Sequence, residues 1–288
     1  MLAHVLGVTF DGFAYGMLLF VLSVGLSVTM GLMGFVNLAH TAFAMLGGYL
    51  CVTFMERLGV PFLATLPLIF LATGALSLVF ERVLYRRLYR AGELDQVLLT
   101  IGLVLMSVAA CSYFWGTEQQ PVTLPKYLSG YFSPGGVDLG VYRLFLSAVG
   151  IALALVLVFG LERTRFGAQV RAAVDNQRMA RGLGIDVNRV FAATFAVGSG
   201  LAGLGGALAV NMIGLDPNFA TKYLVFVLLV VSVGGLGSVG GTFAAAVVLG
   251  ISDVAGKYYV PEAGAFIIYA VMVTLLLWRP AGLFGRRS

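Results

Sequence analysis

The chain has 288 residues, of which 60% are hydrophobic and 11% charged, and its mean hydropathy is +0.97. Soluble domains carry about 25% charged residues, so a soluble fold is excluded and the composition indicates a protein that lies in a lipid bilayer. The net charge of +5 does not indicate nucleic-acid binding, because the positive residues gather in a few connecting segments and form no basic, aromatic-rich surface.

Uncharged stretches long enough to cross a bilayer predict the membrane spans. Residues 12–55 carry no charged side chain and are long enough for two crossings, which the Gly-rich segment 30–37 separates. Residues 223–252 are again uncharged and Gly-rich, and we expect two short or broken helices there. The remaining spans are predicted at 62–80, 96–115, 144–161, 190–212 and 263–278.

These segments predict an all-α, polytopic helical membrane protein of about eight to nine spans, with broken, Gly-rich helices. We expect residues 1–288 to form a single transmembrane domain. Small residues at four-residue spacing, as at Ser199, Gly203 and Ala207, predict helices that pack closely in lipid.

The connecting segments differ in charge, which predicts their sidedness. Most of the lysines and arginines lie in the segments 81–95 and 162–189 and in the tail 279–287. The positive-inside rule puts these three segments, and with them the C-terminus, in the cytoplasm. The Pro-, Gly-, Ser- and Tyr-rich segment 116–142 is then external, as is the N-terminus if residues 12–55 cross twice.

Two glycine patterns imitate nucleotide-binding motifs, and both fail in context. Gly235–Gly240 reads G-x-G-x-x-G, but it lies between two apolar helices and does not follow a strand. Gly256-Lys257 is followed by Tyr258, where a P-loop requires Ser or Thr. We therefore expect no nucleotide site and no ATPase in this chain.

Ionisable groups inside the spans are scarce, and this argues against a proton-coupled transporter or a channel that acts alone. His40 is the only such group well inside a predicted span. No Ser/His/Asp set, carboxylate pair or metal-ligand set converges, so we expect neither a catalytic nor a metal site.

Asn37, His40 and Thr41 are polar residues beside the first Gly-rich break. Polar groups at membrane depth are tolerated where they pair between helices or face a cavity. Two interpretations remain open for these three residues, a substrate path and helix packing.

The segment 162–189 predicts an amphipathic helix outside the membrane. Phe166, Val170, Ala173 and Val174 share one helical face. Gly182 and Gly184 are expected to end this helix, and Asp186 to cap the next one; these residues follow helix-terminus preferences. The helix is either an interfacial anchor or a docking element for a cytoplasmic partner.

At this segment the sequence resembles the permeases of branched-chain amino acid ABC importers, in their shorter, Liv-type form. The resemblance extends in order over nearly the whole chain and is carried by four segments: Gly167…Arg171-Ala172…Asp175-Asn176…Ala180…Gly184-Ile185, Gly34-Phe35-Val36-Asn37-Leu38-Ala39-His40, Gly234-Gly235-Leu236-Gly237-Ser238, and Arg279-Pro280-Ala281-Gly282-Leu283-Phe284-Gly285. One departure is Thr41, where the family usually has Gly.

The resemblance implies a permease subunit that pairs with a second permease, two cytoplasmic ATPase subunits and an extracytoplasmic solute-binding protein. The chain would bind no cofactor, with ATP and Mg²⁺ on the ATPases, and it would be a multi-pass protein of the bacterial inner membrane. In such permeases the segment 162–189 docks into the ATPase as a coupling helix. The matching residues are Gly167, Arg171, Ala172, Asp175, Asn176, Ala180 and Gly184.

The expected function is ATP-driven import of branched-chain or related hydrophobic amino acids. We expect that the chain itself is not an enzyme. Similar permeases carry urea or short amides, and no residue in the chain separates these solutes. A secondary transporter or channel that acts alone is the alternative from another class.

Overall fold

The computed structural model describes residues 2–35, 37–88, 91–120, 122, 124–133 and 137–285. Val36 of the second resembling segment lies outside the described residues, as do Arg90, Arg286 and Arg287 of the basic segments.

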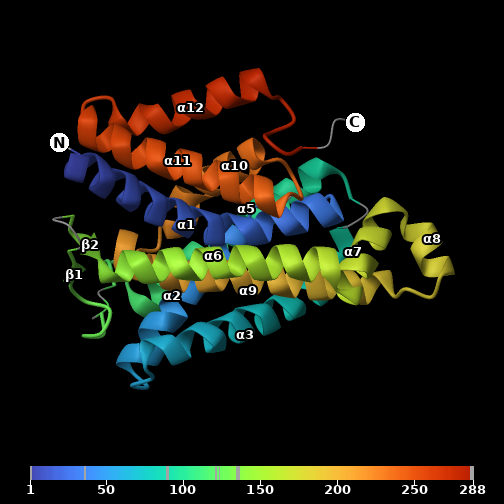
Figure 1. Cartoon of the computed structure of the whole chain (residues 1–288). Coiled ribbons are helices and arrows are strands. Elements are labelled where there is room, and N and C mark those ends of the chain that lie inside the picture. Colours follow the sequence, from blue (N-terminus) through green and yellow to red (C-terminus); the bar gives the residue numbers. More distant parts are fainter. Residues whose placement is uncertain are drawn as a thin grey trace.

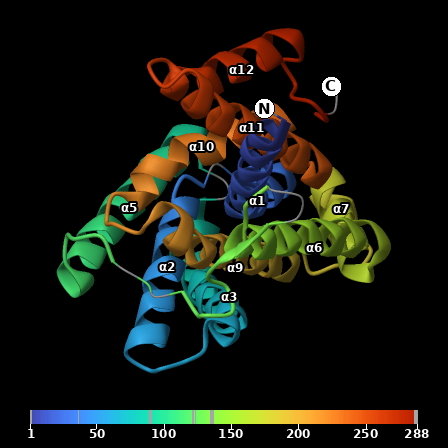
Figure 2. The same ribbon diagram turned by 60° about the vertical axis from the view of Figure 1, so that its left-hand side comes forward.

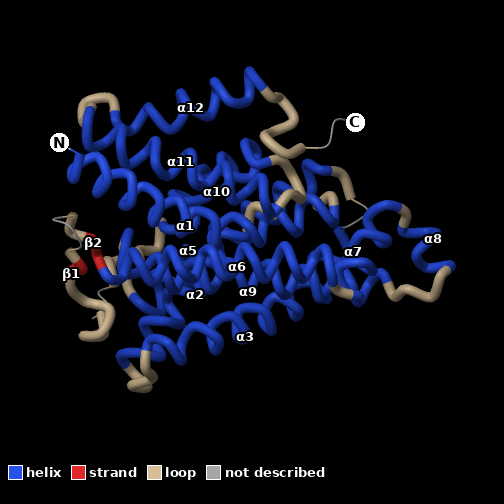
Figure 3. Tube along the Cα trace, in the orientation of Figure 1, coloured by secondary structure: helices blue, strands red, loops and turns tan. Residues whose placement is uncertain are grey.

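The chain folds as a bundle of helices with one two-stranded hairpin (Figures 1 and 3). The strands β1 (Tyr131–Phe132) and β2 (Leu139–Gly140) pair antiparallel. The helices are α1 Leu2–Met33, α2 His40–Glu56, α3 Phe62–Phe80, the π-helical η1 Glu81–Tyr85, α4 Arg86–Leu88, α5 Glu93–Trp115, α6 Val141–Arg163, α7 Arg165–Asp175, α8 Gln177–Gly182, α9 Val187–Ile213, α10 Phe219–Gly234, α11 Val239–Tyr259 and α12 Gly264–Trp278.

The structure confirms a polytopic helical membrane protein. Within the described residues, six helices are long and apolar enough to cross a bilayer, and α10 and α12 are shorter apolar helices. The predicted eight to nine spans therefore hold approximately. The first helix starts at Leu2, before the uncharged stretch that begins at residue 12, and Asp11 within it forms an ion pair with Arg143 of α6.

Both predicted Gly-rich breaks are present. α1 ends before Gly34, which has a φ of +61°, a backbone conformation that favours glycine. α10 ends before Gly235, where φ is +93°, and α11 starts after Ser238. The segment 223–252 therefore belongs to two separate helices, as the sequence predicts.

α1 and α9 form the centre of the bundle (Figure 2). α1 packs against α9 and α11, and α9 also packs against α2 and α3. The side chains of α1 from Ala14 to Leu26 are almost all buried, as expected of a helix that is apolar on every side. α5 and α6 expose apolar side chains along much of their length, which suits lipid contact.

Small residues let the central helices approach closely. A Cβ atom on Gly16 of α1 would lie 2.7 Å from the Ala246 carbonyl oxygen of α11, and one on Gly203 of α9 would overlap Thr73 of α3. Ser199 and Ala207 are buried on the same helix as Gly203. The predicted packing role of this small-residue stripe is confirmed.

The ends of the bundle differ as the charge pattern predicts (Figure 1). The helices α4, α7 and α8 and the described part of the C-terminal tail lie at one end, which we name the arginine-rich end. The N-terminus and the β1–β2 hairpin lie at the opposite end. The three basic segments therefore share one side, while the N-terminus lies on the other.

Candidate functional site

Asn37 lies in the turn between α1 and α2, with 1% of its surface exposed. Its side-chain oxygen accepts a hydrogen bond from the Tyr85 hydroxyl at 3.1 Å. The Tyr85 ring packs edge-on against Phe35, with 5.3 Å between the ring centroids. Within the described residues the Asn37 amide nitrogen has no hydrogen-bond partner. The Asn37 side-chain oxygen therefore holds the turn, whereas its side-chain nitrogen is unpaired.

His40 starts α2 and lies where α2 crosses α1 and α9. Its Nε2 lies 3.0 Å from the Leu22 carbonyl oxygen, which can only accept, so Nε2 carries the proton. Gly25 makes room for the ring, since a Cβ there would lie 2.8 Å from His40 Cε1. The Nδ1 atom has no partner among the described residues.

Thr41 is fully buried, and its hydroxyl is likewise unpaired within the described part of the chain. Asn37, His40 and Thr41 thus share one turn of chain at the start of α2, and each contributes one buried polar atom without a partner. The contacts of Asn37 and His40 hold helices together, as the packing interpretation expects. The unpaired atoms are the feature that the path interpretation requires. A role in the path remains a prediction.

The segment between α6 and α9 forms two short helices, not the single helix that the sequence predicts. Asn176, with φ −155° and ψ 97°, ends α7, and its side chain caps α8 by accepting from the Met179 amide at 2.9 Å. The cap stabilises a break that helical periodicity does not reveal. Gly184 has a φ of +83°, and Asp186 caps α9 by accepting from the Arg189 amide at 3.1 Å. The predicted cap at Asp186 is confirmed.

This pair of helices has a small hydrophobic core of its own. Its members come from α7, α8 and the start of α9, and Met33 of α1 packs against it. The buried residues are Val170, Ala173, Ala180, Val187, Val190 and Phe191. Through this core, α7 and α8 are attached to the two central helices of the bundle.

The shared apolar face of α7 is only partly buried. Val170 and Ala173 are buried, whereas Phe166 and Val174 on the same face are each 37% exposed. Gly167 is also buried, and a Cβ there would overlap the backbone of Leu161. α7 abuts the end of α6 at this glycine, and Gly167, Val170 and Ala173 line the contact face.

The predicted coupling residues divide into two groups. Gly167 and Ala180 are buried, Ala172 is half-buried, and Arg171 donates a hydrogen bond to the Leu161 carbonyl oxygen. These residues hold the two helices in place. The exposed residues that form a surface are Asp175, Asn176 and Gly184. The apolar residues Met179 and Leu183 lie beside them and are also exposed, Leu183 to 76%. The sequence did not single them out, because apolar residues at their positions do not break the helical pattern of the segment.

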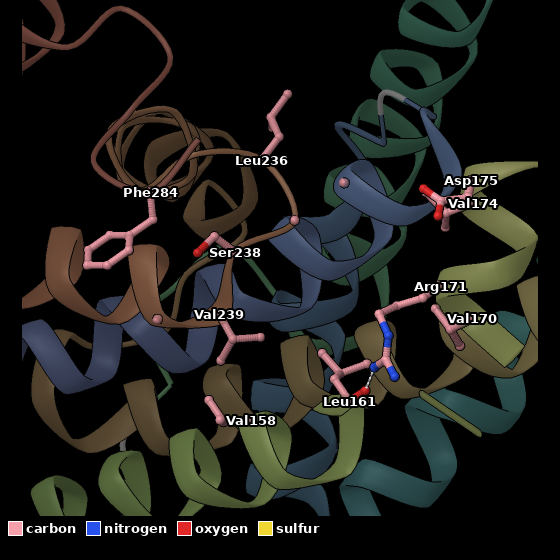
Figure 4. A pocket seen from close by; sticks show the side chains of 13 residues that line it. Val158, Leu161, Val170, Arg171, Val174, Asp175, Leu236, Ser238, Val239 and Phe284 are labelled. Atoms are coloured by element: carbon pink, nitrogen blue, oxygen red, sulfur yellow. Dashed lines mark hydrogen bonds between the residues drawn. The ribbon is translucent and has the colours of Figure 1, made fainter. Parts of the chain in front are cut away.

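A cavity of about 630 Å³ lies at the arginine-rich end (Figure 4). Arg171 and Asp175 of α7 line one side, and Ser238 of the α10–α11 turn and Phe284 of the tail line another. Gly31 at the end of α1 also contributes. Three of the four segments that carry the resemblance therefore meet around one cavity.

Backbone hydrogen bonds join the glycine turn to its surroundings. The amide of Gly237 donates to the Ser27 carbonyl of α1 at 3.1 Å. The amides of Leu283 and Phe284 donate to the carbonyls of Val233 and Gly234, at 2.7 and 3.2 Å. A Cβ on Gly235 would lie 2.6 Å from the Gly285 amide nitrogen, so this contact requires glycine. The tail thus adds to the surface around α7.

The ionisable groups buried inside the apolar helices include one that the sequence prediction left outside the spans. Asp253 lies inside α11 and is 2% exposed, so the expectation that His40 is the only such group within a span is wrong. α11 continues past the uncharged stretch to Tyr259 because Lys257, one turn further on, pairs with Asp253 at 2.6 Å. The pair is locally neutral and is not an isolated coupling acid.

Comparison with known proteins identifies the family. The family described as "Branched-chain amino acid transport system / permease component" matches residues 8–276. The permease BraD of Pseudomonas aeruginosa is 25% identical over 98% of this chain and 96% of its own length. LivH of Escherichia coli (strain K12) is 26% identical, with 96% and 94% covered. LivM of Salmonella typhimurium is 26% identical over 93% of this chain.

Each of these three relatives is named a high-affinity branched-chain amino acid transport system permease protein. They are transport components and not enzymes. The match covers 68% of LivM but nearly all of LivH, which agrees with the predicted likeness to the shorter permease type. The chain therefore belongs to the family of branched-chain amino acid transport permease components.

Proposed function

We propose that this chain is the membrane-spanning permease subunit of an ATP-driven importer for branched-chain or related hydrophobic amino acids. The observation that carries the proposal is the α7–α8 pair, which projects from the bundle and exposes Asp175, Asn176 and Gly184. Two short helices with their own core, packed onto central helices, suit a docking element that transmits force. BraD and LivH, which are named as transport system permease proteins, support the same role.

The chain lies in the bacterial inner membrane. Its arginine-rich end and its C-terminus face the cytoplasm. The positive-inside rule supports this orientation, because the basic connections gather at that end. The opposite end, with the β1–β2 hairpin, then receives solute from the extracytoplasmic binding protein.

The ATPase is a separate polypeptide, present twice, and it holds ATP and Mg²⁺. The absence of an intact P-loop in the sequence supports this division of labour. A second permease completes the membrane part. Relatives of both the LivH and the LivM type support a permease pair, and the path then runs along the contact between the two.

The α7–α8 core gives the chain a means of coupling. ATP binding closes the ATPases and moves α7 and α8, and the core passes that motion to α9 and, through Met33, to the end of α1. These helices would have two packings, one open to each side of the membrane. Access to the solute path alternates between the two sides if the two packings bind the ATP-loaded ATPase with unequal affinity. Asn37, in the turn before α2, and His40 and Thr41, at the start of α2, lie against these helices, and their unpaired atoms face the solute path in one of the two packings.

The test is uptake by liposomes that contain the chain with its ATPases, partner permease and binding protein. Uptake of labelled leucine that saturates and is competed by isoleucine and valine is the expected result. Uptake of urea or an amide that leucine does not compete would retain the architecture and refute the proposed solute.

A further inference from the structure

A second cavity, of about 620 Å³, lies at the bundle end opposite α7 and α8. The end of α9 and the segment that follows α5 form it, and three of its lining side chains are carboxamides, Gln119, Gln120 and Asn211. Its other lining residues are Val122, Leu124, Val210, Met212, Ile213 and Gly214. The site therefore combines an amide-rich part with an aliphatic part.

Hydrogen bonds tie the two described parts of the cavity wall together. The Gln120 amide donates to the Leu215 carbonyl at 2.9 Å, which ties the segment after α5 to the segment after α9. The Gln120 side-chain nitrogen donates to the carbonyls of Trp115 and Glu118, at 3.0 and 3.2 Å. Gly214 has a φ of +77°, and a Cβ there would overlap the Gln119 amide. The Gln120 side chain is thus positioned before any ligand binds, and Gln119 lies against Gly214.

Asn211 supplies a buried donor that the fold leaves partly unused. Its side-chain nitrogen is buried and makes no well-formed hydrogen bond among the described residues. The neighbouring Tyr142 hydroxyl donates to the Leu208 carbonyl at 2.6 Å, and its oxygen can accept one of the two Asn211 amide protons, which leaves the second proton for a ligand. A buried amide proton without an acceptor costs free energy, which a ligand acceptor would recover.

The chemistry of the walls selects the ligand class. Among the described residues that line the cavity none is charged, so a ligand with net charge gains no ion pair. Carboxamides offer both donors and acceptors, which suits a carboxylate and an ammonium group on one small molecule. Val210, Met212 and Ile213 offer apolar surface for an aliphatic side chain.

The geometry points to this cavity as an extracytoplasmic binding site for a zwitterionic aliphatic amino acid, which the permease occupies before the solute moves into the path. The inference rests on the proposed function and names the place where the solute first contacts this chain. It assigns solute recognition to Gln119 and Asn211, in addition to the binding protein.

The test places a cysteine in the wall without removing an amide. Val122→Cys is made in the assembled transporter, and its labelling rate with a membrane-impermeant maleimide is measured on this chain after separation. The native Cys51 and Cys111 are buried and free, so labelling reports the new position. Asn218→Cys, exposed and outside the cavity, is the matched control.

Leucine and valine are expected to slow the labelling of Val122→Cys saturably and to leave the control unchanged. Adding Gln119→Leu or Asn211→Leu raises the protecting concentration about three- to tenfold, the effect of one lost hydrogen bond. Adding Asn218→Leu leaves it unchanged. Gln119 is exposed, so its variant tests the site even if Asn211→Leu misfolds.

Lack of protection by leucine in a preparation that imports leucine would overturn this inference and leave the proposed function intact. Equal protection of both cysteines would also overturn it, as would protection by urea or glycinamide alone. Failure of the same preparation to import any branched-chain amino acid with ATP would instead contradict the proposed function.

Discussion

The guanidinium group of Arg171 on α7 donates a hydrogen bond to the carbonyl oxygen of Leu161 at the end of α6 (Figure 4). This carbonyl belongs to the last turn of α6, where carbonyl oxygens lack partners within the helix. Arg171 therefore caps a membrane helix and fixes α7 beneath it, although its position in the docking segment suggests contact with a partner.

Replacing Arg171 should loosen α7 without unfolding the bundle. Arg171→Ala removes one charge-assisted hydrogen bond at an exposed position, which costs about 1 kcal/mol. We expect faster protease cleavage between α6 and α9 and slower uptake, with Arg171→Lys closer to the parent protein. Limited proteolysis of the purified chain measures the first effect. Unchanged cleavage in Arg171→Ala would contradict the capping role.

Asp175 gives the cleaner test of docking, because its side chain is exposed on α7. Asp175→Arg should fold and assemble in the membrane at the parent level but lower ATP-dependent uptake about tenfold or more, as expected for a reversed charge at a protein interface. Glu262→Arg, the same type of reversal in the exposed turn between α11 and α12, is the control and should retain uptake. Equal uptake by both variants would refute docking through Asp175.

The close contact of α1 with α11 predicts a difference between two glycines. Gly16→Ala places a methyl group against the Ala246 carbonyl and should destabilise the fold by roughly 1–3 kcal/mol. Gly102→Ala on α5 meets no atom within 4 Å and should be neutral or stabilising, since alanine favours helix. Thermal unfolding in detergent compares the two. A Gly16→Ala protein as stable as the parent would contradict the packing described for this helix pair.

Thr41 separates the two interpretations of the polar group on α2. Thr41→Val keeps the shape and removes a buried hydroxyl that has no partner within the described residues, so the fold should gain about 1 kcal/mol. If the hydroxyl serves the solute path, uptake should nevertheless slow. Unfolding temperature and uptake are measured on the same preparation. A more stable variant with parent uptake would assign Thr41 to packing alone.

Sequence reasoning predicted most of the helices because lipid imposes long uncharged runs and glycines mark the breaks. It placed the end of α11 wrongly, since the pairing of Asp253 with Lys257 depends on side-chain geometry that hydropathy does not contain. The close contact between Gly167 and the end of α6 was likewise hidden, because it joins two helices that pattern alone does not place together.

The candidate site was predicted only in pieces. Local pattern identified the segment 162–189 and the glycine turn, but the tail reaches that turn through the contact of Phe284 with Gly234, which are distant in the chain. The break at Asn176 depends on a side-chain cap that competes with helix propensity. The external cavity has no sequence signal, because ordinary amides from two separate segments form it.

The most direct test of the permease role is the nucleotide dependence of leucine accumulation in liposomes that contain the assembled transporter. We expect accumulation against a gradient with ATP, none with a non-hydrolysable analogue, and none when the ATPases are omitted. Leucine accumulation by this chain alone, without nucleotide, would contradict the permease role.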